Sequence, residues 1–186
     1  MQVKGTSVLA TKKFVAGKFG QEGLQRLVDA LPPQSRELYT GAVLASEWYP
    51  IKPALFVPTE VLCRALYNGG DQGAREVGVF SAEDGLRGIY RFFARMASVE
   101  TLLEKTASIF RTYYTPGRME VAERGQQRIV LRMVETDEHD QLFEQRVGGW
   151  LDGALRICGN DSHMVSIGSS LAKGDAATEF IITLSS

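Results

Sequence analysis

The chain has 186 residues, 44% of them hydrophobic and 23% charged, with a formal net charge of −1. Such a chain can bury a core without disulfides, so we expect one soluble domain spanning residues 1–186. The sequence has no Lys/Arg stripe and no apolar run of about 18 residues, which argues against nucleic-acid binding and a transmembrane segment. Cys63 and Cys158 lack CxxC or Cys/His neighbours, so we expect no disulfide and a cytoplasmic location.

Residues 1–116 are predicted to be mainly helical. Apolar residues recur at helical spacing up to Gly20 and resume from Gln21 to Leu31, where Pro32-Pro33 ends the pattern. This pattern predicts a tight helical hairpin. Pro58 is expected at the start of a further helix.

Small residues mark one face of the region after residue 68. They are predicted to let another backbone approach closely, since isolated glycines otherwise cost a helix about 1 kcal/mol each. The glycines concerned are Gly69, Gly70, Gly73 and Gly78. Two or three helices are expected across residues 69–114, and Thr115-Pro116-Gly117 ends the helical half.

Residues 117–186 change the period from 3.6 to 2. Alternation predicts strands at 118–122 and 128–134, and again at 164–171 and 178–184. Between the two pairs, Leu142 to Cys158 carries a wide apolar stripe at helical spacing. The predicted fold is α+β: a helical half packed on a four-stranded antiparallel sheet whose half of the chain reads strand–strand–helix–strand–strand.

The sequence contains few motifs that are typical of catalysis, nucleotide binding or metal binding. No Walker A, Rossmann or Gly-x-Ser-x-Gly pattern occurs. His139 lies in an acidic run that is better explained as a solvated loop before a helix than as a metal site, and His163 is expected at a strand edge. We therefore predict no catalytic residue, no metal and no enzyme, although an active site of spatially assembled carboxylates stays open.

Two stretches near the end of the chain resemble a known family. Gly149–Leu155 and Leu171–Glu179 are similar to the Gly-x-Leu-x-Gly-Ala-Leu helix and Leu-x-Lys-Gly-Asp-x-x-Thr-Glu hairpin of Bet3-like subunits of the TRAPP tethering complex. The glycine-spaced helix resembles that of vinyl-reductase-type ligand-binding domains, and Val3–Thr6 resembles the start of H-NOX domains, which sense nitric oxide through haem. These groups share one superfamily fold of helices followed by a twisted antiparallel sheet, often with a ligand cavity between.

The resemblance also has departures. At the position of the haem-ligating histidine this chain has Glu100, and in place of the Tyr-x-Ser-x-Arg motif it has Val121–Gly125. The resemblance therefore implies no cofactor, with haem not expected. The region of the acylated cysteine of TRAPP subunits, Phe80–Asp84, lacks cysteine, so acylation there is not expected either.

Two functions follow as hypotheses. The first is a haem-free regulatory or scaffolding module that acts through a protein partner or as a homodimer, because the helical half holds more apolar residues than one sheet face can cover. The alternative is a sensor that binds a small apolar ligand or lipid between helices and sheet. The two are compatible, since a ligand can bias an interaction surface. The predicted cavity residues are Phe92, Phe93, Val99, Leu103, Phe110 and Trp150.

Overall fold

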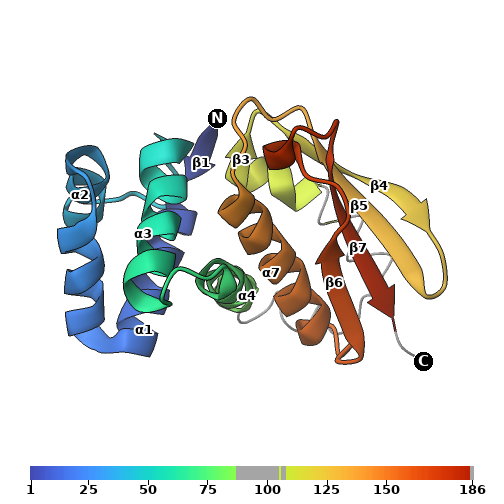
Figure 1. Ribbon diagram of the computed structural model, residues 1–186, viewed down its shortest axis with the longest axis horizontal. Helices are drawn as coiled ribbons and strands as arrows, with labels where there is room; N and C mark the ends of the chain where they lie inside the picture. Colours follow the sequence, from blue (N-terminus) through green and yellow to red (C-terminus); the bar gives the residue numbers. More distant parts are fainter. Residues whose placement is uncertain (87–104, 106–107, 185–186) are drawn as a thin grey trace.

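The computed structural model describes residues 1–86, 105 and 108–184, and it has a helical side and a sheet side (Figure 1). The helical elements are α1 (Gly5–Ala30), α2 (Pro33–Thr40), the π-helix η1 (Lys52–Phe56), α3 (Val57–Leu66), α4 (Gln72–Gly85), α7 (Gln141–Ile157) and the 3₁₀ turn η2 (Leu171–Lys173). The strands are β1 (Gln2–Lys4), β2 (Trp48–Pro50), β3 (Tyr114–Thr115), β4 (Arg118–Arg124), β5 (Arg128–Val134), β6 (His163–Ile167) and β7 (Thr178–Leu184). Residues 108–113 are also helical.

The larger sheet is antiparallel in the order β4-β5-β7-β6, and α7 lies across one of its faces (Figure 1). The predicted α+β class and the strand–strand–helix–strand–strand order are confirmed. Leu131 of β5 pairs with Phe180 of β7, and both are fully buried beneath the helix. β4 runs two residues past its predicted end because a bulge at residue 122 lets the pairing resume.

A second sheet of three short strands, in the order β2-β1-β3, was not predicted from the sequence. Val3 pairs with Tyr49 on one side and Tyr114 on the other, and its side chain is fully buried. This sheet joins the start of α1 to the end of the helical half, so it fixes where α1 begins relative to residues 108–113.

The predicted interruption at Gly20 is present. Gly20 has φ 70° and ψ −176° within α1, a left-handed conformation that glycine adopts without a Cβ penalty. The interruption divides α1 into two helical segments. Only the first segment lines the cavity described below.

Helices α4 and α7 cross at glycines, which confirms the predicted close approach of two backbones. A Cβ at Gly78 would overlap the carbonyl of Arg146, and one at Gly149 would overlap the carbonyl of Arg75. Gly153 repeats this further along, where a Cβ would lie 2.9 Å from the carbonyl oxygen of Val79. The predicted glycine face is shorter than expected, because Gly69 and Gly70 precede α4.

Helix α7 forms the centre of the molecule. Figure 1 shows α4 on the side of α7 away from the sheet, with α1 and α3 beyond it. Twelve of the residues of α7 are buried, so the helix is covered on both sides. Burial on both sides explains the width of its apolar stripe, and it places polar residues such as Arg146 inside the molecule.

Candidate functional site

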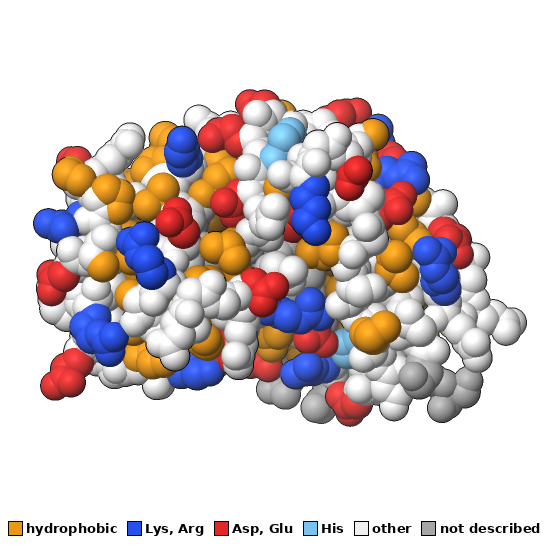
Figure 2. Space-filling view, in the orientation of Figure 1, with side chains coloured by type: hydrophobic (Ala, Val, Ile, Leu, Met, Phe, Trp, Pro, Cys, Tyr) orange, Lys and Arg blue, Asp and Glu red, His pale blue; other side chains and the backbone are white. Residues whose placement is uncertain are grey.

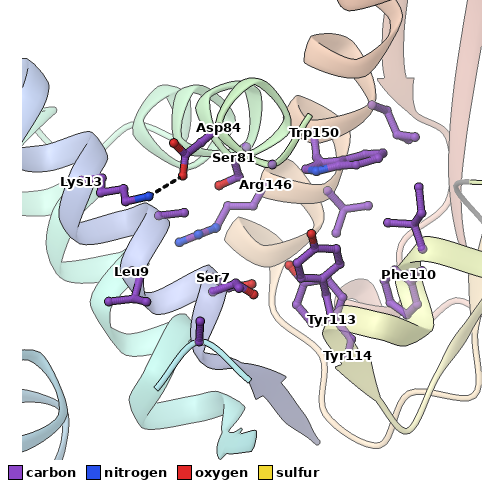
Figure 3. Close-up of a pocket in the computed structure, with 18 of the residues that line it drawn as sticks. Ser7, Leu9, Lys13, Ser81, Asp84, Phe110, Tyr113, Tyr114, Arg146 and Trp150 are labelled. Atoms are coloured by element: carbon purple, nitrogen blue, oxygen red, sulfur yellow. Dashed lines mark hydrogen bonds and ion pairs between the residues drawn. The ribbon is translucent and has the colours of Figure 1, made fainter. Parts of the chain in front are cut away.

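A cavity of about 340 Å³ lies between α1, α4, α7 and residues 108–113 (Figure 3). It sits where the helical half meets the sheet half, and Met119 of β4 also lines it. Ligand pockets in proteins are concave, mostly apolar and contain a few polar groups that orient the ligand. The lining of this cavity has that composition.

Arg146 of α7 provides the buried charge at one end of the cavity. Its side chain is 4% exposed, and its guanidinium donates to Thr59 Oγ1 at 2.8 Å and Thr11 Oγ1 at 3.0 Å. Each threonine hydroxyl in turn donates to a carbonyl four residues earlier, at Ser7 or Leu55. Two neutral hydroxyls, one from α1 and one from α3, therefore hold the guanidinium in place.

No carboxylate forms an ion pair with Arg146 in the part of the chain that the structure describes. The two buried carboxylates of α7 are engaged elsewhere: Glu144 accepts from Ser170 Oγ at 2.6 Å, and Asp152 contacts His163 Nε2 at 2.6 Å. Asp84, at the cavity rim, is 2.9 Å from the exposed ammonium of Lys13 (Figure 3). Among the described residues, Arg146 therefore lies in the interior without a carboxylate partner, and burial lowers the pKa of its guanidinium.

Two tyrosines accompany Arg146: Tyr39, which is buried, and Tyr114, which is half-buried. Burial raises the pKa of Tyr114, although the charge of Arg146 and a hydrogen bond with Ser7 partly oppose the rise. Burial raises the pKa of Tyr39 to about 12, again against the charge of Arg146. Both phenols are thus neutral at physiological pH, and Tyr114 and Ser7 bring hydroxyl groups to the cavity wall.

The opposite end of the cavity is apolar. Phe110 is 5% exposed and stacks at 4.9 Å between ring centroids on Tyr114, while Leu151 is 1% exposed. Figure 3 shows Phe110 and Trp150 on the side towards the sheet, away from Arg146 and Ser7, with Tyr113 and Tyr114 between the two ends. The cavity is thus polar at one end and apolar at the other.

The predicted cavity residues fall into two groups. Phe110 and Trp150 line the cavity, and their role in binding stays a prediction. The other four lie outside the described residues: Phe92, Phe93, Val99 and Leu103. The sequence reasoning missed Arg146, although a signal was present: it lies three residues after Phe143 and four before Trp150, inside the apolar stripe.

The histidines contribute to structure. His139 Nδ1 is 3.1 Å from Thr136 Oγ1, and the neighbouring Asp140 caps α7 by accepting from Phe143 N at 2.8 Å. His163 begins β6, an edge strand, as expected, and its side chain is 1% exposed because Asp152 and the carbonyl of Asn160 hold it. Among the described residues, no three His, Cys, Asp or Glu side chains gather as a metal site would require.

Comparison with known proteins gives the fold. No family model and no curated protein matches the sequence. Among solved structures, an H-NOX protein from S. oneidensis in the Fe(II)NO state has 14% identity and a TM-score of 0.75, with 98% of this chain and 99% of that chain covered. An Fe(II) unliganded H-NOX protein from K. algicida has 12% identity and a TM-score of 0.72, with coverage of 98% and 97%. A structure on haem distortion in the H-NOX family has 15% identity and a TM-score of 0.68, with coverage of 98% and 95%.

Haem requires a side chain in the lining of its site that ligates the iron. Protein side chains that hold haem iron are histidine, cysteine, methionine and tyrosine. The described lining offers Tyr113, Tyr114 and Met119 but neither histidine nor cysteine. The described cavity therefore does not fit a histidine-ligated haem.

Two predictions are corrected by the comparison. The haem-free interaction module is wrong as the main function, because the structural neighbours are H-NOX proteins in Fe(II) states. Its premise also fails: the surplus apolar residues are buried around α7, and among the described residues only Leu44 and Met164 are large exposed hydrophobics. The prediction of no cofactor is contradicted by the same neighbours. That prediction depended on two short stretches at which this sequence differs from the motifs of the haem sensors. One of them, at Glu100, lies outside the described residues. The chain has the H-NOX fold.

Proposed function

We propose that the chain is a sensor domain that binds a small molecule in the cavity between its helical half and its sheet. The observation that carries this proposal is the buried Arg146, which pairs with no carboxylate among the described residues, at the wall of a 340 Å³ cavity whose other end is apolar. A purely structural interior would fill such a space with side chains, because protein cores pack as densely as organic crystals.

The position of the cavity supports sensing rather than catalysis. Its walls come from α1, α4, α7 and residues 108–113, so a ligand would touch elements from both halves of the chain. A ligand that binds one arrangement of these elements better than another shifts the population between them. No nucleophile with an adjacent base lies in the described lining, and we propose that the domain is not an enzyme.

The experiment is non-denaturing mass spectrometry of the full chain purified from cells. The wild-type protein is expected to carry a small-molecule adduct. The Ala10→Phe variant places a ring at a cavity-lining position of α1 that is 7% exposed, and should lose the adduct. Ala30→Phe, at an exposed position of the same helix, is the matched control and should keep it.

Either of two results would contradict the proposal. One is a wild-type protein with no adduct whose melting temperature does not respond to any added lipid, haem or small carboxylate. The other is an adduct that Ala10→Phe retains as well as Ala30→Phe does. The absorption spectrum of the purified protein identifies a porphyrin directly if the adduct is one.

The proposal includes a protein partner that responds to ligand binding. We propose that ligand binding is read by a second copy of the chain or by another protein in the cytoplasm. Figure 2 shows basic and acidic side chains interspersed over the visible face, without the basic stripe of a nucleic-acid surface. Among the described residues, no helix is both long and apolar enough to cross a membrane. Light scattering with and without ligand tests whether ligand binding changes the association of the chain with a second copy of itself.

A further inference from the structure

We propose that the ligand of this cavity is a small monocarboxylate, with its carboxylate on Arg146 and its apolar body beside Phe110 and Trp150. This inference rests on the proposed function and names the chemical class of its ligand. It follows from the hydrogen bonds, the charge and the shape of the site.

The hydrogen bonds of Arg146 leave most of its donors available. A guanidinium has five N–H donors, and only two are used by Thr59 and Thr11. No other hydrogen bond from its side chain is formed within the described part of the chain. A carboxylate accepts two parallel N–H donors from one guanidinium, which is the most favourable pairing for a planar fork of this kind.

The charge of the site favours an anion. Among the described lining residues, Lys13 and Asp84 form an ion pair at the rim, so Arg146 contributes one uncompensated positive charge. A buried charge is costly unless it is paired with an opposite one. One negative charge on the ligand would balance the site, and two would overcompensate it.

The shape of the site favours an amphiphile. Ser7 lies at the same end as Arg146, Tyr114 lies between the two ends, and Phe110 and Trp150 lie at the other end (Figure 3). The volume of about 340 Å³ is at the lower end of the range of ligand pockets, and it admits a phenyl or short alkyl group with its carboxylate. Aromatic or alkyl carboxylates of this size therefore meet the polar end, the apolar end and the volume together.

The test compares three probes of equal size by calorimetric titration into the full chain. They are 4-phenylbutyrate, its neutral amide and the cationic 4-phenylbutylamine. Wild-type protein should bind the acid about tenfold more tightly than the amide, because charge-assisted hydrogen bonds are about twice as strong as neutral ones. The amine should bind most weakly.

Two variants assign the preference to one residue. Arg146→Met should reduce the difference between acid and amide to about twofold or less. Lys52→Met removes an exposed cation that does not line the cavity, and it should leave the tenfold difference unchanged. Circular dichroism verifies that each variant is folded. The three-probe series on wild-type protein needs no variant and stands alone if Arg146→Met does not fold.

The outcomes separate this inference from the proposed function. Preference for the acid that disappears in Arg146→Met supports both. Equal binding of acid and amide, or tightest binding of the amine, overturns the carboxylate inference while the cavity remains a ligand site. Preference for the acid that survives in a folded Arg146→Met also overturns it. Absence of binding for all three probes overturns the carboxylate inference. The proposed function is overturned as well only if the purified wild-type protein also lacks an adduct.

Discussion

Arg146 of α7 donates from Nη2 to Thr11 Oγ1 of α1 at 3.0 Å, which links two helices 135 residues apart in the sequence. Nη1 makes the equivalent bond to Thr59 of α3 at 2.8 Å. One buried guanidinium thus connects α1, which lines the cavity, and α3 to the central helix. These bonds contribute to stability and also fix the position of the charge that we assign to ligand binding.

The Arg146–Thr11 pair should show strong coupling in a double-mutant cycle. Thr11→Val is expected to lower the free energy of unfolding by about 1.5–3 kcal/mol, because it leaves a buried charged donor unpaired. In an Arg146→Met background the same substitution should cost less, with a coupling energy of about 0.5–3 kcal/mol. Urea denaturation measures all four proteins.

Thr40→Val is the control for this cycle. Thr40 Oγ1 makes the same kind of bond to a carbonyl four residues earlier, at Arg36, but it is exposed and no arginine donates to it. Its substitution should change stability by about 0.5 kcal/mol or less. A Thr11→Val effect as small as this would mean that water replaces the hydroxyl and that Arg146 is not held as described.

The crossing of α4 and α7 should not tolerate a methyl group. Gly149→Ala is expected to lower the free energy of unfolding by about 1–3 kcal/mol, because the added Cβ would overlap the carbonyl of Arg75. Gly17→Ala is the matched control: it lies in α1, is exposed and has no atom within 4 Å of an added Cβ. That change should raise stability by about 0.5–1 kcal/mol, as it does in open helix positions. Equal effects in thermal melts would contradict the close crossing.

Glu144 should be the most sensitive carboxylate of α7. It accepts hydrogen bonds from Ser170 Oγ and Thr178 Oγ1, both at 2.6 Å, and from Ala172 N at 3.1 Å, and no cation pairs with it among the described residues. Glu144→Gln replaces one acceptor oxygen with an NH₂ group, which cannot accept these hydrogen bonds. The substitution should lower the free energy of unfolding by about 1–3 kcal/mol, as measured by chemical denaturation. Exposed Glu37→Gln should be neutral within about 0.5 kcal/mol. A neutral Glu144→Gln would refute this network.

Alkaline pH should destabilise the protein through its buried tyrosines. The pKa of Tyr39 is raised from 10.0 to about 12 in the folded protein, so the unfolded chain loses its proton first. Stability is therefore unaffected by this group below pH 10 and falls between pH 10 and about 12, by roughly 2–3 kcal/mol at the upper end. Tyr39→Phe should flatten the decline in urea-denaturation series, whereas Tyr49→Phe should not. Identical declines in wild type and Tyr39→Phe would contradict the burial of a neutral phenol here.

The sequence predicted the parts of the fold whose periodicity spans enough residues. β7 was predicted with the bounds Thr178–Leu184, because its apolar residues alternate on a face that α7 buries. The close helix crossing followed from Gly78 and its neighbours. The small sheet was missed since β1, β2 and β3 have only two or three residues each, too few for a period, and they pair across more than 40 residues of sequence.

The site was harder to predict than the fold. Aromatic residues at helical spacing led to Phe110 and Trp150, which line the cavity. Arg146 was not singled out, because a charged residue within an apolar stripe is only informative once the other side of the helix is known to be covered. Ser7 and Tyr114 reach the same space only through the pairing of β1 with β3, which no local pattern encodes. The spacing of the glycines predicts the close crossing of two helices, but it does not predict which residues surround that crossing.

The most direct test of the ligand-sensing account is a crystal structure of the wild-type chain purified without added ligand or after soaking with 4-phenylbutyrate. The account predicts non-protein electron density between Arg146 and Trp150, with an acidic group facing the guanidinium. A cavity filled by the protein's own side chains in both crystals, with Arg146 paired to a carboxylate of the chain, would contradict it.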